Sequence, residues 1–107
     1  MFKDNIKEAI KFIKHFLGQQ GISIDKIILF GSYADNTFTQ ESDVDIAIIS
    51  SAFEHKDIFQ RAEMLKGLDW ALVERFMLPF DIIPISLQEW KGSNSLIVEF
   101  AHQGIET

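Results

Sequence analysis

Two stretches of the sequence decide the fold: KIILFGS at residues 26–32 and DVDIAIIS at residues 43–50. Each contains a short apolar run rich in β-branched residues, which predicts a buried strand. The first run stops at Gly31, and the second opens with a pair of aspartates. We therefore expect strands at residues 26–30 and 43–50. The polar segment between them, rich in turn-forming residues, leaves room for one short helical turn.

The flanking segments alternate between helical and strand patterns. Apolar residues recur at helical spacing in two long segments, and two polar-to-acidic pairs, Asn5 with Glu8 and Ser86 with Glu89, have the spacing of a capping box. The expected elements are a helix at 5–18, one long helix at 56–78, a strand at 80–85, a short helix from 86 and a last helix at 95–103.

This order of elements predicts an α/β (α+β) domain with a mixed three-stranded core sheet and flanking helices. The helix between the second and third strands is long enough for a crossover, so those strands should run parallel. If the first strand runs antiparallel to the second, its end at Gly31 reaches the end of the sheet where the other two strands start. Pro84 indicates either an edge position for the third strand or the end of that strand.

Composition narrows the classes of protein. The 107 residues fit one domain, residues 1–107, with a self-standing core. There is no cysteine, which excludes disulfides and thiolate chemistry, and the net charge of -6 argues against direct nucleic-acid binding. No segment has the length and apolarity of a membrane span, and charged residues interrupt the N-terminal pattern that a signal peptide needs. A cytoplasmic protein is the expectation.

Three aspartates are the candidate metal ligands. Asp43 and Asp45 lie two apart in a strand, so both side chains should leave the same face. Two carboxylates so close repel each other unless a cation lies between them, and hard oxygen ligands suit Mg²⁺. Asp81 starts the third strand and should reach the same end of the sheet. We therefore expect Asp43, Asp45 and Asp81 to be catalytic and to hold magnesium, with two ions about 3.5–4 Å apart.

Gly31 and Ser32 are the candidate phosphate-binding residues. Glycine lets a phosphate approach the backbone closely, and Ser32 offers a hydroxyl and a backbone N–H. A triphosphate bound there would reach ions held by Asp43 and Asp45. Structural explanations also exist for each residue: an Asp-x-Asp pair is often solvated, Asp81 after Pro79 fits a turn, and Ser32 fits a helix cap.

The combination of Gly31-Ser32, ten intervening residues and Asp43-Val44-Asp45 resembles the motif of the minimal nucleotidyltransferases, in the DNA polymerase β-like superfamily. The resemblance covers about residues 5–105. It implies that Gly31 and Ser32 bind the β- and γ-phosphates, that Asp43 and Asp45 bind both magnesium ions, and that Asp81 helps activate the acceptor hydroxyl. A nucleoside monophosphate, AMP from ATP, would then pass to that hydroxyl with release of pyrophosphate.

The resemblance also implies a partner. Small stand-alone members look like the antitoxin half of HEPN–MNT toxin–antitoxin pairs, in which the antitoxin can transfer AMP to a tyrosine of a helical ribonuclease toxin. Aminoglycoside and tRNA nucleotidyltransferases resemble the same core but carry extra domains that shape the acceptor site. This chain has no room for such a domain, so the acceptor surface is expected to come from the partner. Phe53 and Phe80 are candidates for a partner surface if exposed.

One departure from the family pattern leaves a second function open. Many relatives carry Arg-Gly where this chain has Asp35 and Asn36, so a cation that could neutralise the triphosphate is missing. A non-catalytic module that neutralises the toxin by binding it is the alternative. A phosphatase of the haloacid dehalogenase type fits less well, because its Asp-x-Asp motif ends a strand whereas Asp43 and Asp45 start one.

Overall fold

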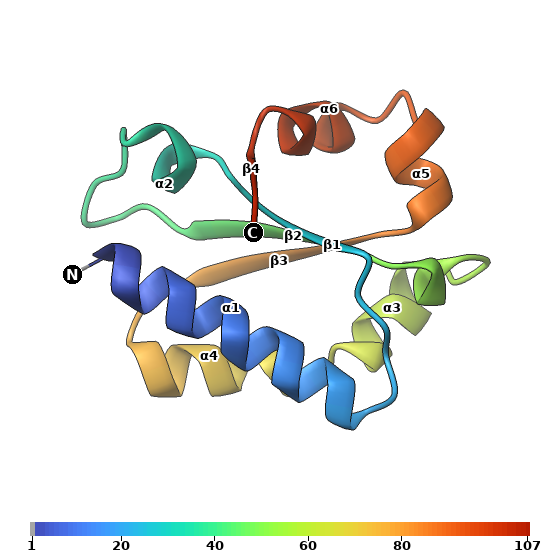
Figure 1. Cartoon of the computed structure of the whole chain (residues 1–107), viewed down its shortest axis with the longest axis horizontal. Coiled ribbons are helices and arrows are strands. Elements are labelled where there is room, and N and C mark those ends of the chain that lie inside the picture. The colour runs from blue at the N-terminus through green and yellow to red at the C-terminus, as the bar shows by residue number, and fades with distance from the viewer. Residues whose placement is uncertain (1) are drawn as a thin grey trace.

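The computed structural model describes residues 2–107, without the side chains of residues 2 and 3. Figure 1 shows a sheet with helices on both faces, α1 and α4 on one and α5 and α6 on the other. The elements are α1 (Phe2–Gln19), β1 (Lys26–Phe30), α2 (Ser32–Asp35), β2 (Val44–Ile49), the 3-10 turn η1 (Ser51–Phe53), α3 (Ile58–Met64), α4 (Leu68–Phe76), β3 (Phe80–Ile85), α5 (Leu87–Gly92), α6 (Leu96–His102) and β4 (Ile105–Glu106). The α/β fold class is confirmed.

The sheet has the strand order β3-β2-β1-β4 within the described residues. β2 pairs parallel with β3, as the sequence predicts, and β1 pairs antiparallel with β2, which is the condition for Gly31 to reach the acidic residues. Pro84 lies on an edge strand, where its missing N–H costs no ladder bond. The prediction of three strands was incomplete, because β4 pairs antiparallel with β1 through Leu29 and Ile105. Two residues are too short a run for any periodicity to reveal.

The prediction of one helix over residues 56–78 was wrong, because the segment forms α3 and α4 with a break between them. Gly67 adopts φ 88°, a left-handed conformation that interrupts a helix and that glycine tolerates best. Apolar spacing carries on across the break because Leu68 and Leu72 still point into the core. Hydrophobic periodicity alone therefore could not locate it.

The start of the first helix also differs from the prediction. α1 already includes Phe2, so Asn5 lies inside the helix and does not cap it. The Ser86 and Glu89 capping box is confirmed: Glu89 N donates to the Ser86 hydroxyl at 3.1 Å and Ser86 N to the Glu89 carboxylate at 2.8 Å. Both pairs have the same spacing, and only the second stands at a helix start.

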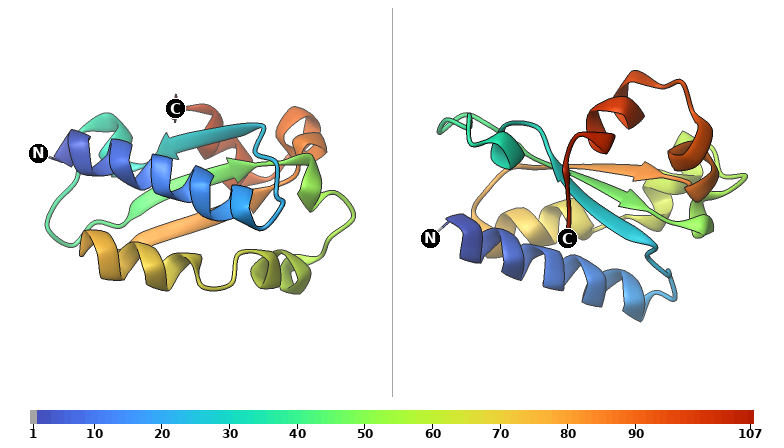
Figure 2. Two further views of the ribbon diagram at one scale, coloured as in Figure 1. Left: turned by 60° about the horizontal axis from the view of Figure 1, so that its bottom comes forward. Right: turned by 45° about the horizontal axis from the view of Figure 1, so that its top comes forward.

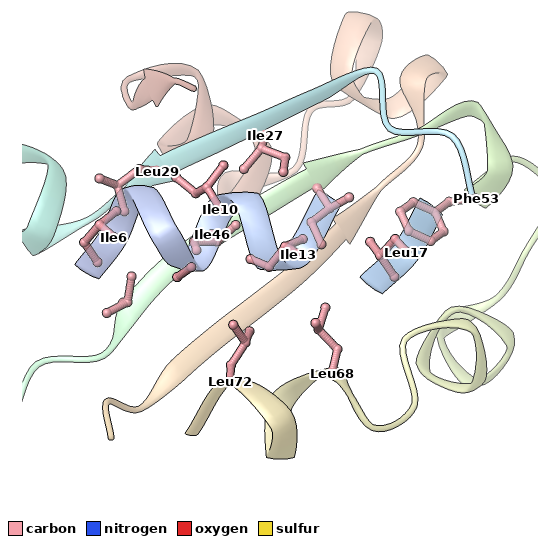
Figure 3. Close-up of a cluster of buried hydrophobic side chains, with 13 residues drawn as sticks. Ile6, Ile10, Ile13, Leu17, Ile27, Leu29, Ile46, Phe53, Leu68 and Leu72 are labelled. Carbon is pink, nitrogen blue, oxygen red and sulfur yellow. The ribbon is translucent and has the colours of Figure 1, made fainter. Parts of the chain in front are cut away.

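A hydrophobic cluster joins each face of the sheet to its helices. Figure 3 shows the larger cluster, in which α1, α4 and one face of the sheet meet around Ile13, Leu17, Ile46 and Leu72. The smaller cluster contains Ala47 and Ile49 from the other sheet face and Val98 and Ala101 from α6. Alternate residues of β2 thus enter opposite clusters, so the strand is covered on both faces.

Two phenylalanines were considered for a partner surface, on the condition that they are exposed. Phe53 is fully buried and Phe80 is half-buried, so neither is the exposed partner residue that we considered. Large apolar side chains are instead exposed on α3 and α4, Phe59 and Trp70 among them. None of the helices found in residues 2–107 has the length and apolarity that a bilayer crossing requires.

Candidate active site

Asp45 and Asp81 lie side by side on neighbouring parallel strands. The register of β2 and β3 pairs Asp45 with Asp81 directly. Paired residues point to the same face of a sheet, and adjacent strands are about 4.8 Å apart. Asp43 precedes β2 by one residue and is exposed. The parallel topology therefore brings the predicted acidic residues to one end of the sheet, as expected from the crossover.

Gly31 brings the end of β1 against these carboxylates. Phe30 pairs with Asp45 in the antiparallel ladder, so Gly31 follows immediately beside it. Gly31 has φ 74° and ψ -154°, a combination that is essentially restricted to glycine. A Cβ added there would overlap the Asp45 carboxylate. Close approach of backbone and acid at this point thus requires glycine for both its conformation and its size.

A short helical turn, α2, follows Gly31. The N–H groups of Ala34 and Asp35 donate to the Gly31 carbonyl at 3.0 and 3.3 Å. These two amides therefore close the turn itself. The N–H of Ser32, the one that we expected to bind phosphate, is not one of them. The Ser32 side chain is half-buried at the edge of the cavity described below.

The departure at Asp35 and Asn36 has a local structural explanation. Asn36 ends α2 with φ 64° and ψ 26°, a left-handed conformation that asparagine tolerates better than most residues. The Asp35 carboxylate accepts from the backbone N–H of Thr37 at 3.1 Å and from its hydroxyl. Asp35 and Asn36 thus keep the turn intact, whereas the arginine charge has no replacement at these two positions.

A cavity of about 560 Å³ opens beside the acidic residues. One side is formed by the end of β1, α2 and the carboxylates, including Gly31, Ser32, Asp45 and Asp81. The opposite side belongs to α6 and presents Ile97, Phe100 and Gln103. No lysine or arginine lies among the described residues that line it.

The α6 side of the cavity was not predicted. Ile97 and Phe100 are 38% and 50% exposed, although Val98 and Ala101 of the same helix are buried. The signal was present in the sequence, because α6 is apolar on two faces, and such a helix has a second surface to cover. Because α6 is short, one buried apolar face already explains its hydrophobic periodicity, so the second apolar face is not apparent from the pattern.

The acidic residues interact electrostatically. Burial raises the pKa of Asp45 above its ordinary value, and the negative charges of Asp81 and Asp43 raise it further. Asp69, at the start of α4, also has a raised pKa, caused first by burial and then by the charge of Asp81. Asp69 was not among the candidates, since nothing in its local sequence separates it from a first-turn acid that stabilises a helix.

The carboxylates match the chemistry of a magnesium site. Their oxygens are hard ligands, and the mutual repulsion that raises the Asp45 pKa is what a bound divalent cation would offset. In residues 2–107, no three His, Asp or Glu side chains stand close enough to form a complete ligand cluster. Asp45 and Asp81 line the cavity, whereas Asp43 stands outside its lining.

The known proteins to which this chain is similar fall into one class. The model of the nucleotidyltransferase domain family matches residues 6–101. A chain of Methanocaldococcus jannaschii named "putative protein adenylyltransferase" is 33% identical over 107 residues, which is 92% of this chain and 98% of the relative. A second chain of that organism with the same name is 48% identical over 46 residues, 42% of this chain and 46% of the relative.

A solved structure has the same fold. The crystal structure of a nucleotidyltransferase from Sulfolobus solfataricus, described as putative, aligns with a TM-score of 0.58 and 21% identity over 84% of this chain and 77% of the other. The fold, the acidic strand ends and the family match define a nucleotidyltransferase. The chain belongs to the nucleotidyltransferase domain family, and the enzyme class expected from the sequence is confirmed.

Proposed function

We propose that the chain transfers AMP from ATP to a hydroxyl group of a protein, with the nucleotide bound between α2 and α6. The observation that carries this proposal is the pairing of Asp45 with Asp81 beside Gly31, at the mouth of a cavity of about 560 Å³. Both relatives from Methanocaldococcus jannaschii are named as protein adenylyltransferases, which supports the protein acceptor.

Each residue type has a role in such a transfer. The triphosphate lies along Gly31 and Ser32, where the missing side chain of glycine lets it approach the backbone. Asp43, Asp45 and Asp81 would hold Mg²⁺, which supplies positive charge to the triphosphate oxygens. The apolar residues of α6, Ile97 and Phe100, cover the nucleoside and keep water from it.

The bonds change at the α-phosphorus. The acceptor oxygen forms a bond to that atom, and the bond to the pyrophosphate oxygen breaks with its electron pair. The hydroxyl proton passes to a carboxylate at the edge of the cavity, and Asp81 is the one on the outermost strand. Catalysis then consists mainly of positioning and charge neutralisation.

The acceptor that we propose is a tyrosine of a cognate HEPN ribonuclease toxin, which makes the chain an antitoxin. The family resemblance supports this partner, and the exposed Phe59 and Trp70 on α3 and α4 are compatible with a protein-binding surface.

Incubation with ATP labelled at the α-phosphate, Mg²⁺ and the protein encoded by the neighbouring gene tests the proposal. We expect label on the partner and none when ATP carries the label at the γ-phosphate. Asp45→Asn should abolish transfer, whereas Glu63→Gln removes a carboxylate from exposed α3 and should not. Absence of label from the partner, or equal transfer by Asp45→Asn, would contradict the proposal.

A second function, neutralisation of the toxin by binding alone, is favoured by the cavity lining. It contains Asp35, Asp45 and Asp81 and no cationic side chain among the described residues. An Asp43→Ala/Asp45→Ala double variant separates the two functions. Full protection from the toxin by this variant favours binding alone, whereas loss of protection with retained binding favours AMP transfer.

A further inference from the structure

One side of β3 is free of strand pairing, and the hydrogen bonds to β2 show which backbone groups face outward. The N–H of Val44 donates to the Pro79 carbonyl at 2.9 Å, and the N–H of Ser50 donates to the Ile85 carbonyl at 3.0 Å. Backbone groups alternate in direction along a strand. The backbone N–H and C=O groups of the odd-numbered residues of β3 therefore point toward β2. The backbone groups of Phe80, Ile82 and Pro84 point away from the sheet.

The end of this outer edge that lies away from Asp81 is closed to an added strand. Pro84 has no N–H to offer, and its carbonyl accepts a bond from Arg61 Nη1 at 3.3 Å. Arg61 is held in place by the Glu89 carboxylate at 2.6 Å and by the Lys56 carbonyl at 2.9 Å. Proline and an inserted charge are devices by which proteins block the edges of sheets.

The end of the edge that contains Asp81 is open. Within residues 2–107, no side-chain or loop hydrogen bond reaches the outward backbone groups of Phe80 and Ile82. A groove of about 700 Å³ runs beside Ile82 and Pro84, between β3 and the segment from α3 to the first turn of α4. Figure 2 shows β3 at the border of the sheet, next to α4.

Resting on the proposed function, we propose that the open edge from Phe80 to Ile82 binds an extended segment of the acceptor protein as an added antiparallel strand. Ile82 would pair with one residue of the segment through both backbone groups. The next residue of the segment would then stand opposite Asp81, with its side chain on the face that carries Asp81 and Asp45. The edge would thus choose the acceptor hydroxyl by its position in the strand.

A second copy of this chain is a less suitable occupant. Antiparallel pairing of two β3 edges around their open ends would bring Asp81 opposite Asp81, and like charges directly opposite destabilise a strand pair. A segment with tyrosine, serine or threonine opposite Asp81 introduces no such repulsion.

Transfer to synthetic peptides tests this inference. The substrate is a heptapeptide of glutamine and valine with a central tyrosine as its only hydroxyl side chain, offered with Mg²⁺ and ATP labelled at the α-phosphate. In the added strand, the residues flanking the tyrosine turn their N–H groups toward β3, and the tyrosine N–H turns away. Methylation of the flanking N–H groups should slow labelling about tenfold or more, the effect of losing a buried hydrogen-bond pair. Methylation of the tyrosine N–H is the matched control and should change the rate little.

A protein variant gives the reciprocal test. Ile82→Pro removes the outward N–H that the segment would use and keeps the ladder to β2, as Pro84 does two residues on. It should lose peptide labelling and keep MgATP binding, whereas Ile82→Val should keep both. Equal labelling of all the peptides, or labelling by Ile82→Pro at the rate of Ile82→Val, overturns the inference.

The binding measurement separates the two proposals. If the protein binds MgATP and labels none of the peptides, the strand-pairing inference is overturned and the proposed nucleotide site stands. If it binds no MgATP, the proposed function fails, and the inference fails with it. Dimers of wild type that Ile82→Pro abolishes would assign the edge to a second copy and also overturn the inference.

Discussion

Gly31 connects the fold to the chemistry at the scale of a single residue. Its backbone conformation, φ 74° and ψ -154°, is costly for other residues, and the space for a Cβ is filled by the Asp45 carboxylate. Gly31, which follows β1 directly, and Asp45, the second residue of β2, thus constrain each other. A substitution at either position should affect both stability and nucleotide binding.

Gly31→Ala should destabilise the protein by about 1–3 kcal/mol, the cost of a strained backbone conformation, and weaken MgATP binding. Urea unfolding and calorimetric titration measure the two effects. Gly18→Ala is the matched control, because a Cβ at Gly18 in α1 meets nothing within 4 Å. It should stabilise the protein by about 0.5–1 kcal/mol through helix propensity. If Gly31→Ala behaves like Gly18→Ala, the close approach to Asp45 is refuted.

Without metal, the stability of the Asp45→Asn variant should fall less with rising pH than that of the wild type. Burial and the charges of Asp81 and Asp43 raise the pKa of Asp45 in the folded state, so folding favours its protonated form. The associated stability is present below the ordinary carboxyl pKa of 3.8 and is lost as pH rises through the raised value. Urea midpoints in EDTA, measured from pH 3.5 to about 7, should fall more for wild type than for Asp45→Asn.

Mg²⁺ supplies the control for that experiment. If the acidic residues bind it, the wild type should regain stability near neutral pH when Mg²⁺ replaces EDTA, and Asp45→Asn should gain less. Parallel pH curves for the two proteins in EDTA would mean that neither burial nor the charges of Asp81 and Asp43 raise the pKa of Asp45.

The site residues were predictable to different degrees, for physical reasons. Asp45 and Asp81 follow from strand periodicity and the parallel crossover, and the structure places them in register. Asp69 comes from a helix that packs next to β3, and its nearness to Asp81 depends on tertiary packing that no local pattern encodes. The left-handed Asn36 was visible only as a departure from the family pattern, because its conformation is a property of the folded turn.

At the scale of elements, α6 has two apolar faces that lie in different environments. Val98 and Ala101 are buried against the sheet, and Ile97 and Phe100 face the cavity. Sequence periodicity predicts a helix of this kind readily. It does not say which of two apolar faces remains open, because that depends on what the sheet leaves uncovered.

Phe100→Ala should weaken MgATP binding about tenfold, as expected for loss of one aromatic contact with a nucleoside. The half-exposed position of Phe100 means that the midpoint of urea unfolding should change little. Calorimetric titration measures the affinity. Phe59→Ala, an equally large truncation on α3 that does not line the cavity, serves as control. Equal affinities for the two variants would remove α6 from the proposed nucleotide site.

Arg61 links three elements, and its loss should destabilise the fold. It bridges the Glu89 carboxylate on α5, the Pro84 carbonyl on β3 and the Lys56 carbonyl before α3. Arg61→Met keeps the apolar part of the side chain and removes these bonds, which should cost about 1–3 kcal/mol in urea unfolding. Glu89→Gln, which keeps a hydrogen-bond acceptor, should cost less. Equal losses would show that charge rather than bonding geometry sets the contribution of Arg61.

The elements themselves were predictable where one dominant period controls the chain. β1, β2 and β3 have the expected positions within one residue at each end. The break at Gly67 and the strand β4 were missed, because a left-handed glycine and a two-residue pairing leave hydrophobic spacing unchanged. Both features become visible only when the helices and the sheet are packed together.

At the scale of the whole molecule, three separate parts of the chain meet at one end of the sheet. The antiparallel pairing of β1 with β2 and the parallel pairing of β2 with β3 are both needed, because reversal of either would send Gly31 or Asp81 to the other end. Within the described residues, the same strand order leaves β3, which carries Asp81, at the border of the sheet, where we propose that the acceptor protein binds.

The central claim is that Asp45 and Asp81, beside Gly31, bind ATP together with Mg²⁺. The most direct measurement is a calorimetric titration of ATP into the protein with and without Mg²⁺, repeated for Asp45→Asn, Asp81→Asn and the control Glu63→Gln. The account predicts binding that requires Mg²⁺, that is lost in both aspartate variants and that is unchanged in the control. Binding of equal strength in wild type and Asp45→Asn, or no binding of ATP by wild type in the presence of Mg²⁺, would contradict it.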